Sequence, residues 1–310
     1  MLKKKIFIYL FAIFFINISV SISLENKILI KIENQIITSL DIDKEYKYLI
    51  TLNPGIKISK KGDIIKLSKK SIIQEKIKEI EIKKNFQDPK IPQEILEKIL
   101  QNIYSRMGIN NLSDFKEYLE NNSINFRDVK KKLEIEAFWN ELILIKFSSK
   151  IKIDKENLRK KIREDNSELL ESYLMSEIFF EVSNIKDLDK KFLEISNTIK
   201  AKGFDFAALE HSTSSTSNLG GKLDWINENS LNKNILIAIK DLKIKDFSKP
   251  IVVPGGFLVL QINDIKKNKV EINMDQKLKN LINFERNYQL NQYSKIYYNK
   301  VKKNLEINEL

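Results

Sequence analysis

The first half of the chain is dominated by apolar residues that recur every three or four positions. This period extends over residues 64–84 and again over residues 93–106, which predicts two amphipathic helices. Two more helices are predicted to begin at Ser113 and Asn125, where a capping residue precedes an apolar period. Pro92 suits the first turn of the second helix. The first half should therefore be a set of packed helices.

A different pattern precedes these helices. Residues 28–32 alternate apolar and polar side chains, and two more isoleucines follow the pair Asn34-Gln35. This spacing predicts two short strands joined by a tight turn. Thr38 or Ser39 is then predicted to cap the next helix, with Asp41 near the positive end of its dipole.

The second half mixes strands and helices in a β-α-β-α-β order. A charged helix over 155–170 is predicted to lead into it. Strands are predicted over 173–182 and 257–265, and helices over 188–202, 204–211 and 231–242, with a polar loop over 212–221. Trp225 and Phe257 are predicted to be core residues.

The chain ends in one long amphipathic helix, predicted over residues 272–305. At 1.5 Å per residue it would extend roughly 50 Å. Its apolar stripe needs a partner, and the N-terminal helices are the expected one. The predicted fold class is therefore α+β and mostly helical, with a first domain built from both ends of the sequence. Trp139 and the tyrosines between Tyr288 and Tyr298 are expected to anchor this packing.

The N-terminus has the pattern of an export signal. Three lysines at 3–5 precede an apolar stretch over 6–18, and small residues follow, so cleavage is expected after Ser21 or Ser23. The alternative is an uncleaved anchor, because the uncharged run over 6–24 is long enough to reach across a bilayer. In either case the rest of the chain is expected outside the cytoplasm.

Composition narrows the possible functions. The chain contains no cysteine, which excludes disulfides and thiolate chemistry. Its formal net charge is +12, but lysines and glutamates are interspersed and no arginine-rich cluster stands out, so a nucleic-acid partner is not predicted. No metal or cofactor is predicted either, since no residue group has ligand spacing and the glycine pairs lack the context of a phosphate loop.

Five segments of the second half resemble the parvulin-type peptidyl-prolyl isomerases. They are Met175-Ser-Glu-Ile-Phe-Phe, Gly203-Phe-Asp-Phe-Ala-Ala-Leu, Gly220-Gly-Lys-Leu-Asp-Trp, Phe247-Ser-Lys-Pro-Ile and Gly255-Gly-Phe-Leu-Val-Leu. The first half resembles the periplasmic SurA-type chaperones, through Ile30-Lys-Ile-Glu-Asn-Gln-Ile-Ile-Thr-Ser-Leu-Asp. The resemblance implies four parts: a signal peptide (1–23), a helical chaperone domain (24–170), a parvulin-like domain (171–266) and a C-terminal helix packing back on the first domain (267–310).

The parvulin resemblance assigns the candidate site position by position. The family's two active-site histidines fall at Glu177 and Leu258, and its acid or thiol falls at Thr213. The apolar shelf of the peptide pocket is kept as Leu231 and Ile235. All three polar positions differ, so no catalytic residue is assigned. A pocket lined by Leu231, Ile235, Leu258 and Glu177 is expected to bind peptides with weak or no isomerase activity.

The only histidine of the chain, His211, lies two residues before the Thr213 position. It could act as a displaced general acid or a pH sensor, but we expect it to be a polar residue that closes a short surface helix.

Together with the export signal, the resemblance to the SurA-type chaperones implies an ATP-independent periplasmic chaperone for unfolded outer-membrane β-barrel polypeptides. We expect it to be a monomer, with no stable membrane insertion if the signal is cleaved. An active isomerase that uses Glu177 and Thr213 as substitute polar groups is the alternative, and a folding factor anchored by its retained signal is a third.

Overall fold

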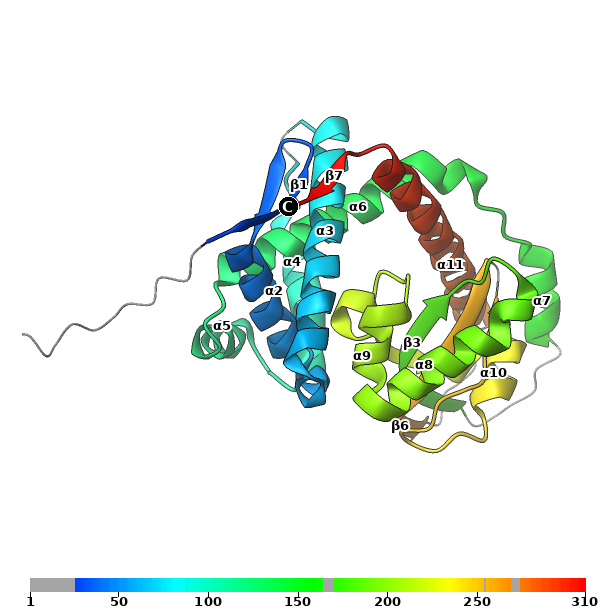
Figure 1. Cartoon of the computed structure of the whole chain (residues 1–310). Coiled ribbons are helices and arrows are strands. Elements are labelled where there is room, and N and C mark those ends of the chain that lie inside the picture. The colour runs from blue at the N-terminus through cyan, green and yellow to red at the C-terminus, as the bar shows by residue number, and fades with distance from the viewer. Residues whose placement is uncertain (1–25, 88, 164–169, 254, 269–273) are drawn as a thin grey trace, which may run out of the picture.

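Figure 1 shows the computed structural model, which describes residues 26–87, 89–163, 170–253, 255–268 and 274–310. The predicted signal peptide lies outside these residues. Helices dominate, and the chain has the α+β class expected from its sequence.

The first part is a helical unit that begins with a hairpin. Its elements are β1 (Ile28–Ile32), β2 (Gln35–Thr38), α2 (Ser39–Leu52), α3 (Lys61–Asn85), α4 (Gln93–Arg106), α5 (Leu112–Asn121) and α6 (Phe126–Phe147). Thr38 is the N-cap of α2: its hydroxyl accepts from the amide of Asp41, whose carboxylate accepts from the amide of Thr38 in return. Pro92 occupies the N-cap position of α4 instead of its first turn.

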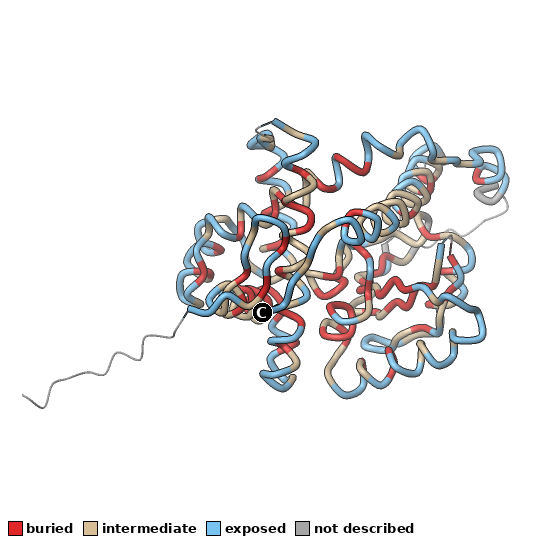
Figure 2. Tube along the Cα trace, turned by 45° about the horizontal axis from the view of Figure 1, so that its top comes forward, coloured by how far each residue is buried: buried red, intermediate tan, exposed pale blue. Residues whose placement is uncertain are grey.

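The helical unit has a layered apolar core. Figure 2 shows buried residues recurring at intervals along the helices, with exposed residues between them. One cluster joins Leu49, Leu100 and Phe115 to Val129 of α6. A second cluster joins Ile30 and Ile37 of the hairpin to Ile77 and Trp139. The three- and four-residue spacing of these side chains is what places them on one face of each helix.

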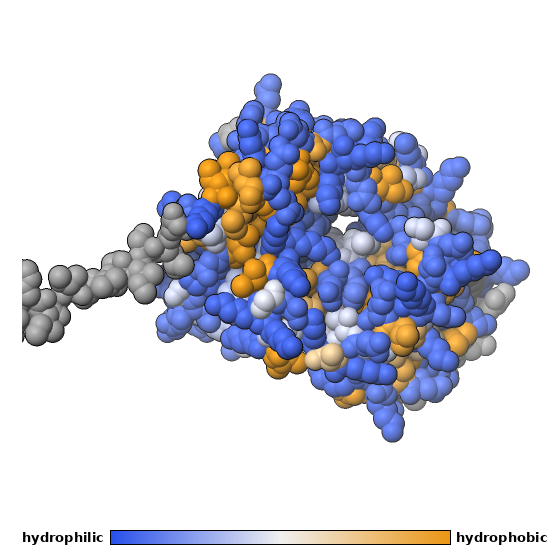
Figure 3. Space-filling view, in the orientation of Figure 1, coloured by the Kyte–Doolittle hydropathy of each residue, from blue (hydrophilic) through white to orange (hydrophobic). Residues whose placement is uncertain are grey.

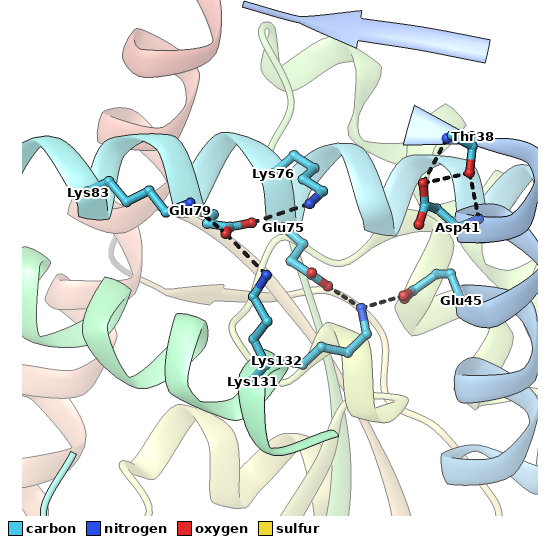
Figure 4. A network of polar contacts seen from close by, with 9 residues as sticks. All are labelled: Thr38, Asp41, Glu45, Glu75, Lys76, Glu79, Lys83, Lys131 and Lys132. Carbon is cyan, nitrogen blue, oxygen red and sulfur yellow. Dashed lines mark hydrogen bonds and ion pairs between the residues drawn. The ribbon is translucent and has the colours of Figure 1, made fainter. Parts of the chain in front are cut away.

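A buried ion-pair network crosses this core (Figure 4). The ammonium group of Lys132 on α6 lies between the carboxylates of Glu45 on α2 and Glu75 on α3. Burial alone would lower the pKa of Lys132, but the two carboxylate charges hold it above its ordinary value. Three helices are therefore joined by one cation.

The second part is a mixed unit around an antiparallel sheet. Its elements are α7 (Lys155–Arg163), β3 (Leu170–Phe180), α8 (Leu188–Lys202), α9 (Phe204–His211), β4 (Lys222–Asn227), α10 (Lys233–Ile239), β5 (Ile251–Val253) and β6 (Gly256–Asn268). The strand order is β4-β3-β6-β5. Short 3-10 turns occur in both units, at Pro54–Ile58, Ser148–Lys150, Ile185–Asp187, Ser217–Leu219 and Glu228–Ser230.

The mixed unit corrects three sequence-based expectations. Leu170 begins β3 and is not the end of the preceding helix. The edge strand β5 was not predicted, and the middle strand of the expected β-α-β-α-β order, for which no residue range was predicted, is the edge strand β4. Trp225 is not a core residue: it lies on edge strand β4, is 36% exposed, and is covered by the ammonium of Lys266 at 4.0 Å from the ring centroid.

Helices cover both faces of this sheet. On one face, α8 and α9 pack against the side chains of Ile178, Phe180 and Val259. On the other face, α10 packs against Met175, Phe179 and Leu260. Alternate residues of β3 and β6 therefore point to different helices, as the two-residue period of a strand requires.

The long helix α11 (Met274–Lys303) returns along both units, and β7 (Ile307–Glu309) pairs with β1 to complete a second sheet of order β2-β1-β7. Trp139 of α6 is almost fully buried and donates its indole N–H to Ser294 of α11 at 2.8 Å. Phe147 stacks on Tyr293 with a centroid distance of 4.9 Å. The expected packing of the C-terminal helix on the N-terminal helices, with aromatic anchors, is present. The residue boundaries of the four predicted parts stay a prediction.

Candidate functional site

The predicted pocket residues lie together on the α10 face of the β4-β3-β6-β5 sheet. Leu258 on β6 is the direct partner of Phe179 on β3, and Glu177 lies two residues before Phe179 on the same face. Leu231 and Ile235 belong to the same buried cluster as Leu258. Tertiary structure thus brings four residues from three segments into one site, although their role in peptide binding stays a prediction.

Glu177 has hydroxyl partners that the sequence did not identify. Its Oε1 accepts hydrogen bonds from the hydroxyl of Ser214 at 2.5 Å and from that of Thr216 at 2.9 Å. Burial raises the pKa of the Glu177 carboxyl, and the two hydroxyl donors oppose that rise. The polar group at this position is therefore a carboxyl with two hydroxyls, a set that lacks the cationic character of a histidine pair.

Thr213 takes no part in this set. Its amide donates to the carbonyl of Phe179 at 2.8 Å, and its hydroxyl donates to the same oxygen at 3.3 Å. Both donors of the residue are used to fasten the loop to β3. The residues beside it in the polar loop, Ser214 and Thr216, supply the hydroxyls that face Glu177. Only the tertiary structure distinguishes these neighbours, because all three are small hydroxyl residues.

A residue from α11 completes the site. Tyr288 is buried in the same cluster as Leu231, Ile235 and Leu258. Its ring meets the ring of Phe179 edge-on, with 5.5 Å between centroids. The apolar spacing of α11 predicts Tyr288 as an anchor of helix packing, and its place in this pocket is decided by the tertiary structure.

His211 ends α9 beside the site and does not enter it. Its Nε2 lies 3.0 Å from the hydroxyl of Thr198, and its Nδ1 lies 3.5 Å from the ammonium of Lys191. Burial, followed by the charges of Lys191 and Lys70, lowers the pKa of His211 to about 4. The imidazole is therefore neutral near pH 7, which agrees with a polar residue closing a helix and argues against a sensor at neutral pH.

Two clefts lie where the helical and mixed units meet. The larger, of about 480 Å³, lies between α3, α6, α11 and the Ser212–Ser215 loop. Six lysines and two aromatic residues are among those that line its walls. The lysines are Lys66, Lys69, Lys70, Lys78, Lys295 and Lys302, and the aromatic residues are Trp139 and Tyr298. The smaller, of about 240 Å³, lies between α4, α6 and the loop residues Ser215 and Asn218. Figure 3 shows the largely hydrophilic face of the molecule, with a hollow between the units.

Among the described residues, no group of histidine and carboxylate side chains is arranged to hold a metal ion. Within that part of the chain, every helix is too short or too polar to cross a bilayer.

Comparison with known proteins identifies the mixed unit. Residues 178–264 match the profile of the Rotamase family, described as the PPIC-type PPIASE domain. The chain is also 22% identical over 185 residues to the Chaperone SurA of Pseudomonas aeruginosa, an alignment that covers 56% of this chain and 44% of that protein. The match therefore spans less than half the length of that relative.

Solved structures similar to this chain include one from a report on two SurA-like chaperones of Campylobacter jejuni, the virulence factor PEB4 and the periplasmic protein Cj1289. It is 16% identical over 92% of this chain and 99% of its own, with a TM-score of 0.36. A PpiC-type peptidyl-prolyl cis-trans isomerase domain is 25% identical over 33% of this chain and 96% of its own, with a TM-score of 0.28. PrsA from Bacillus subtilis is 15% identical over 90% of this chain and 92% of its own, with a TM-score of 0.28.

Proposed function

We propose that this chain, a relative of SurA that carries one PPIC-type parvulin domain, is an ATP-independent periplasmic chaperone for unfolded outer-membrane β-barrel proteins. Its N-terminal sequence has the features of an export signal, which supports delivery across the inner membrane. In this proposal the helical unit does most of the holding, and the parvulin domain contributes a peptide pocket with weak or no isomerase activity.

The clefts between the two units are the observation that carries this proposal. Each is lined both by helices of the first unit and by the loop that follows α9. The larger cleft offers a wall of lysine side chains with Trp139 and Tyr298. A strand of an unfolded barrel alternates apolar and polar residues and has unpaired backbone groups, so aromatic contact and long flexible cations suit it without demanding one sequence.

Weak catalysis follows from the polar groups of the pocket. Rotation about a prolyl bond is helped by groups that favour the twisted amide over the planar one. The carboxyl of Glu177 is already engaged by Ser214 and Thr216, and Leu258 offers no polar atom. Thr213 is fastened to the backbone of β3. Among these pocket side chains, few polar groups remain to stabilise the twisted prolyl amide.

The chaperone proposal is tested by an aggregation assay. A barrel protein denatured in urea is diluted into buffer with and without a several-fold excess of the purified chain, and light scattering is followed. The proposal expects scattering to be suppressed. The test variant reverses two charges in the larger cleft, Lys66→Glu with Lys302→Glu. Its control reverses two charges outside the cleft, Lys186→Glu with Lys240→Glu. Undiminished aggregation with the wild-type chain would reject the proposal.

An active isomerase is the second candidate, and the observation that favours it is the carboxyl of Glu177 on the same sheet face as the pocket residue Leu258. In a protease-coupled proline isomerisation assay, such an enzyme would show turnover comparable to that of an active parvulin. The double variant Glu177→Ala with Thr213→Ala should then lose this turnover. Because Ser214 and Thr216 are the hydroxyls that bond Glu177, the variant Ser214→Ala with Thr216→Ala is the companion test.

The state of the N-terminus decides between a released chaperone and an anchored folding factor. N-terminal sequencing of the protein recovered from cells should give a first residue just after Ser21 or Ser23. A chain that still begins at Met1 and sediments with membranes would favour the anchored form. Gel filtration with light scattering is expected to give the mass of a monomer.

A further inference from the structure

The proposed peptide pocket is already filled by part of the same chain. Tyr288 of α11 belongs to the buried cluster that contains Leu231, Ile235 and Leu258. Its ring meets Phe179 edge-on, and the ring of Phe284, one helical turn earlier, lies 5.8 Å from it. A client side chain that entered this pocket would have to take the place of Tyr288.

Further contacts along the same face of α11 keep Tyr288 in this position. The side chain of Gln292 packs directly on Gly255, just before β6. A Cβ atom added to Gly255 would lie 2.3 Å from the side-chain carbonyl carbon of Gln292. Lys295 pairs with Glu181, just after β3, at 2.9 Å. Residues 284, 288, 292 and 295 follow the spacing of one helix face. A single face of α11 therefore runs along the pocket.

This contact also contains unsatisfied polar groups. The hydroxyl of Tyr288 and the side-chain nitrogen of Gln292 are buried without a hydrogen-bond partner among the described residues. Burial, followed by the nearby charge of Glu177, raises the pKa of the Tyr288 hydroxyl. Buried groups that lose water without gaining a partner offset part of the apolar gain. Such a contact is easier to displace than a fully satisfied core.

We propose that α11 is a built-in competitor for the parvulin pocket, in which Tyr288 closes the pocket at rest and a client segment enters only when this face of α11 lifts away. The proposal rests on the pocket assigned under the proposed function and adds its regulation. A pocket that is open for only a fraction of the time has its apparent affinity reduced by that fraction. Removing the competitor should therefore strengthen peptide binding, although the pocket walls are unchanged.

The first test is a binding measurement with the fluorescein-labelled peptide Ala-Phe-Pro-Phe, followed by anisotropy. Tyr288→Ala is expected to bind this probe about tenfold more tightly than the wild-type chain, because the competing ring is gone. Ile296→Ala is the matched control, since it shortens an exposed side chain on the same helix. This control should bind the probe like the wild type.

A second variant opens the pocket without changing the aromatic ring. Lys295→Glu replaces the ion pair with Glu181 by a repulsion, and it is expected to tighten probe binding in the same direction. Circular dichroism establishes that each variant is folded, so Lys295→Glu decides the question if Tyr288→Ala fails to fold. Equal affinity of the wild type and the folded opening variants would overturn the proposal, and so would a complete lack of binding by all of them.

A disulfide that can be formed and reduced tests the opposite change, in which α11 is held against the pocket. The chain has no cysteine, so Gly255→Cys with Gln292→Cys creates one possible disulfide between α11 and the pocket turn. Probe binding should be lost on oxidation and return on reduction. An oxidised protein, with the disulfide verified by mass, that binds as well as its reduced form would overturn the proposal.

The barrel-protein aggregation assay separates this proposal from the chaperone proposal. If the wild-type chain fails to protect the barrel protein while Tyr288→Ala gains peptide binding, the chaperone proposal falls and the closure of the pocket by α11 stands. If the chain protects the barrel protein while the opening and locking changes leave probe binding unaltered, only the closure by α11 falls.

Discussion

Lys132 illustrates how much of this fold can depend on one side chain. Its ammonium group is the cation between Glu45, which is almost fully buried, and Glu75. Tyr48 lies beneath it, with the ammonium 5.0 Å from the ring centroid. Removing the cation would leave two largely buried carboxylates facing each other at the wall of the smaller cleft, where their like charges repel.

We therefore predict that Lys132→Met lowers the free energy of unfolding by about 3 kcal/mol, as expected when one partner of a buried pair is lost. Lys130→Met is the control, because Lys130 makes only an exposed pair with Glu134 at 3.7 Å. The control should lose less than about 0.5 kcal/mol. Urea denaturation followed by circular dichroism measures both, and similar losses for the two variants would contradict the prediction.

His211 gives the stability a defined dependence on pH. Its pKa is about 4 in the folded chain, against an ordinary value of 6.5, because burial and then the charges of Lys191 and Lys70 disfavour the imidazolium. The charge of Glu194 acts in the opposite direction, and Lys202 adds to the lowering. Between these two values the unfolded chain binds a proton that the folded chain does not.

The predicted consequence is a loss of stability as the pH falls from 6.5 toward about 4, and no contribution from His211 above this window. The loss should be of order 2 kcal/mol after allowance for partial solvent exposure. The difference in unfolding free energy between wild type and His211→Gln, measured at several pH values, isolates this contribution from that of the carboxylates. A difference that does not change with pH would refute it.

At the scale of elements, the turn before β4 shows why a glycine is needed where it occurs. Gly221 has a φ of +73°, and a Cβ there would lie 2.2 Å from the carbonyl oxygen of Glu177. The carbonyl of Gly221 also accepts the amide of Glu177 at 2.7 Å. The glycine thus sets how closely the loop approaches β3 and how Glu177 is presented.

Gly221→Ala is predicted to lower the unfolding free energy by at least about 2 kcal/mol, because the backbone must shift and the left-handed conformation disfavours alanine. Gly62→Ala is the matched control: it lies in the first turn of α3, and a Cβ there would meet nothing within 4 Å. The control should be neutral or stabilising by up to about 1 kcal/mol. Chemical denaturation of both variants checks the prediction, and equal midpoints would contradict it.

At the scale of the whole molecule, the two units share their cores. Phe206 and Leu209 of α9 are buried in the same cluster as Leu100 and Phe115 of the helical unit. Arg106 of α4 also makes a bidentate ion pair with Asp224 of β4, with 3.0 Å between Nε and Oδ1 and 2.9 Å between Nη2 and Oδ2. Together with α11, which packs on both units, these contacts join them into one folding body.

We accordingly predict a single cooperative unfolding transition. The two tryptophans report on different units, since Trp139 lies on α6 and Trp225 lies on β4. Trp225→Phe leaves the helical reporter and Trp139→Phe leaves the parvulin reporter. In each variant the fluorescence transition should coincide with the loss of far-ultraviolet circular dichroism. Two separated transitions in either variant would show that the units unfold independently.

The sequence by itself determined the elements whose signals are local. The apolar period with its capping and stop residues fixed α4, α8 and α9 to the residues at which they occur. Thr38 or Ser39 was predicted as a cap because a hydroxyl before an apolar run satisfies free amides at a helix end, and the N-cap is Thr38. The need to bury a long apolar stripe was enough to predict that the C-terminal helix would return to the first unit.

Tertiary structure alone decided the contents of the site. Edge strands β4 and β5 are short, and pairing with β3 and β6 defines them more than their own residues do. Ser214 and Thr216, instead of Thr213, meet Glu177 because the loop is fastened to β3 through Thr213. Tyr288 meets Phe179 in the pocket although more than a hundred residues separate the two along the chain. A local pattern states that a side chain must be buried, but the partner that buries it depends on how distant segments meet in space.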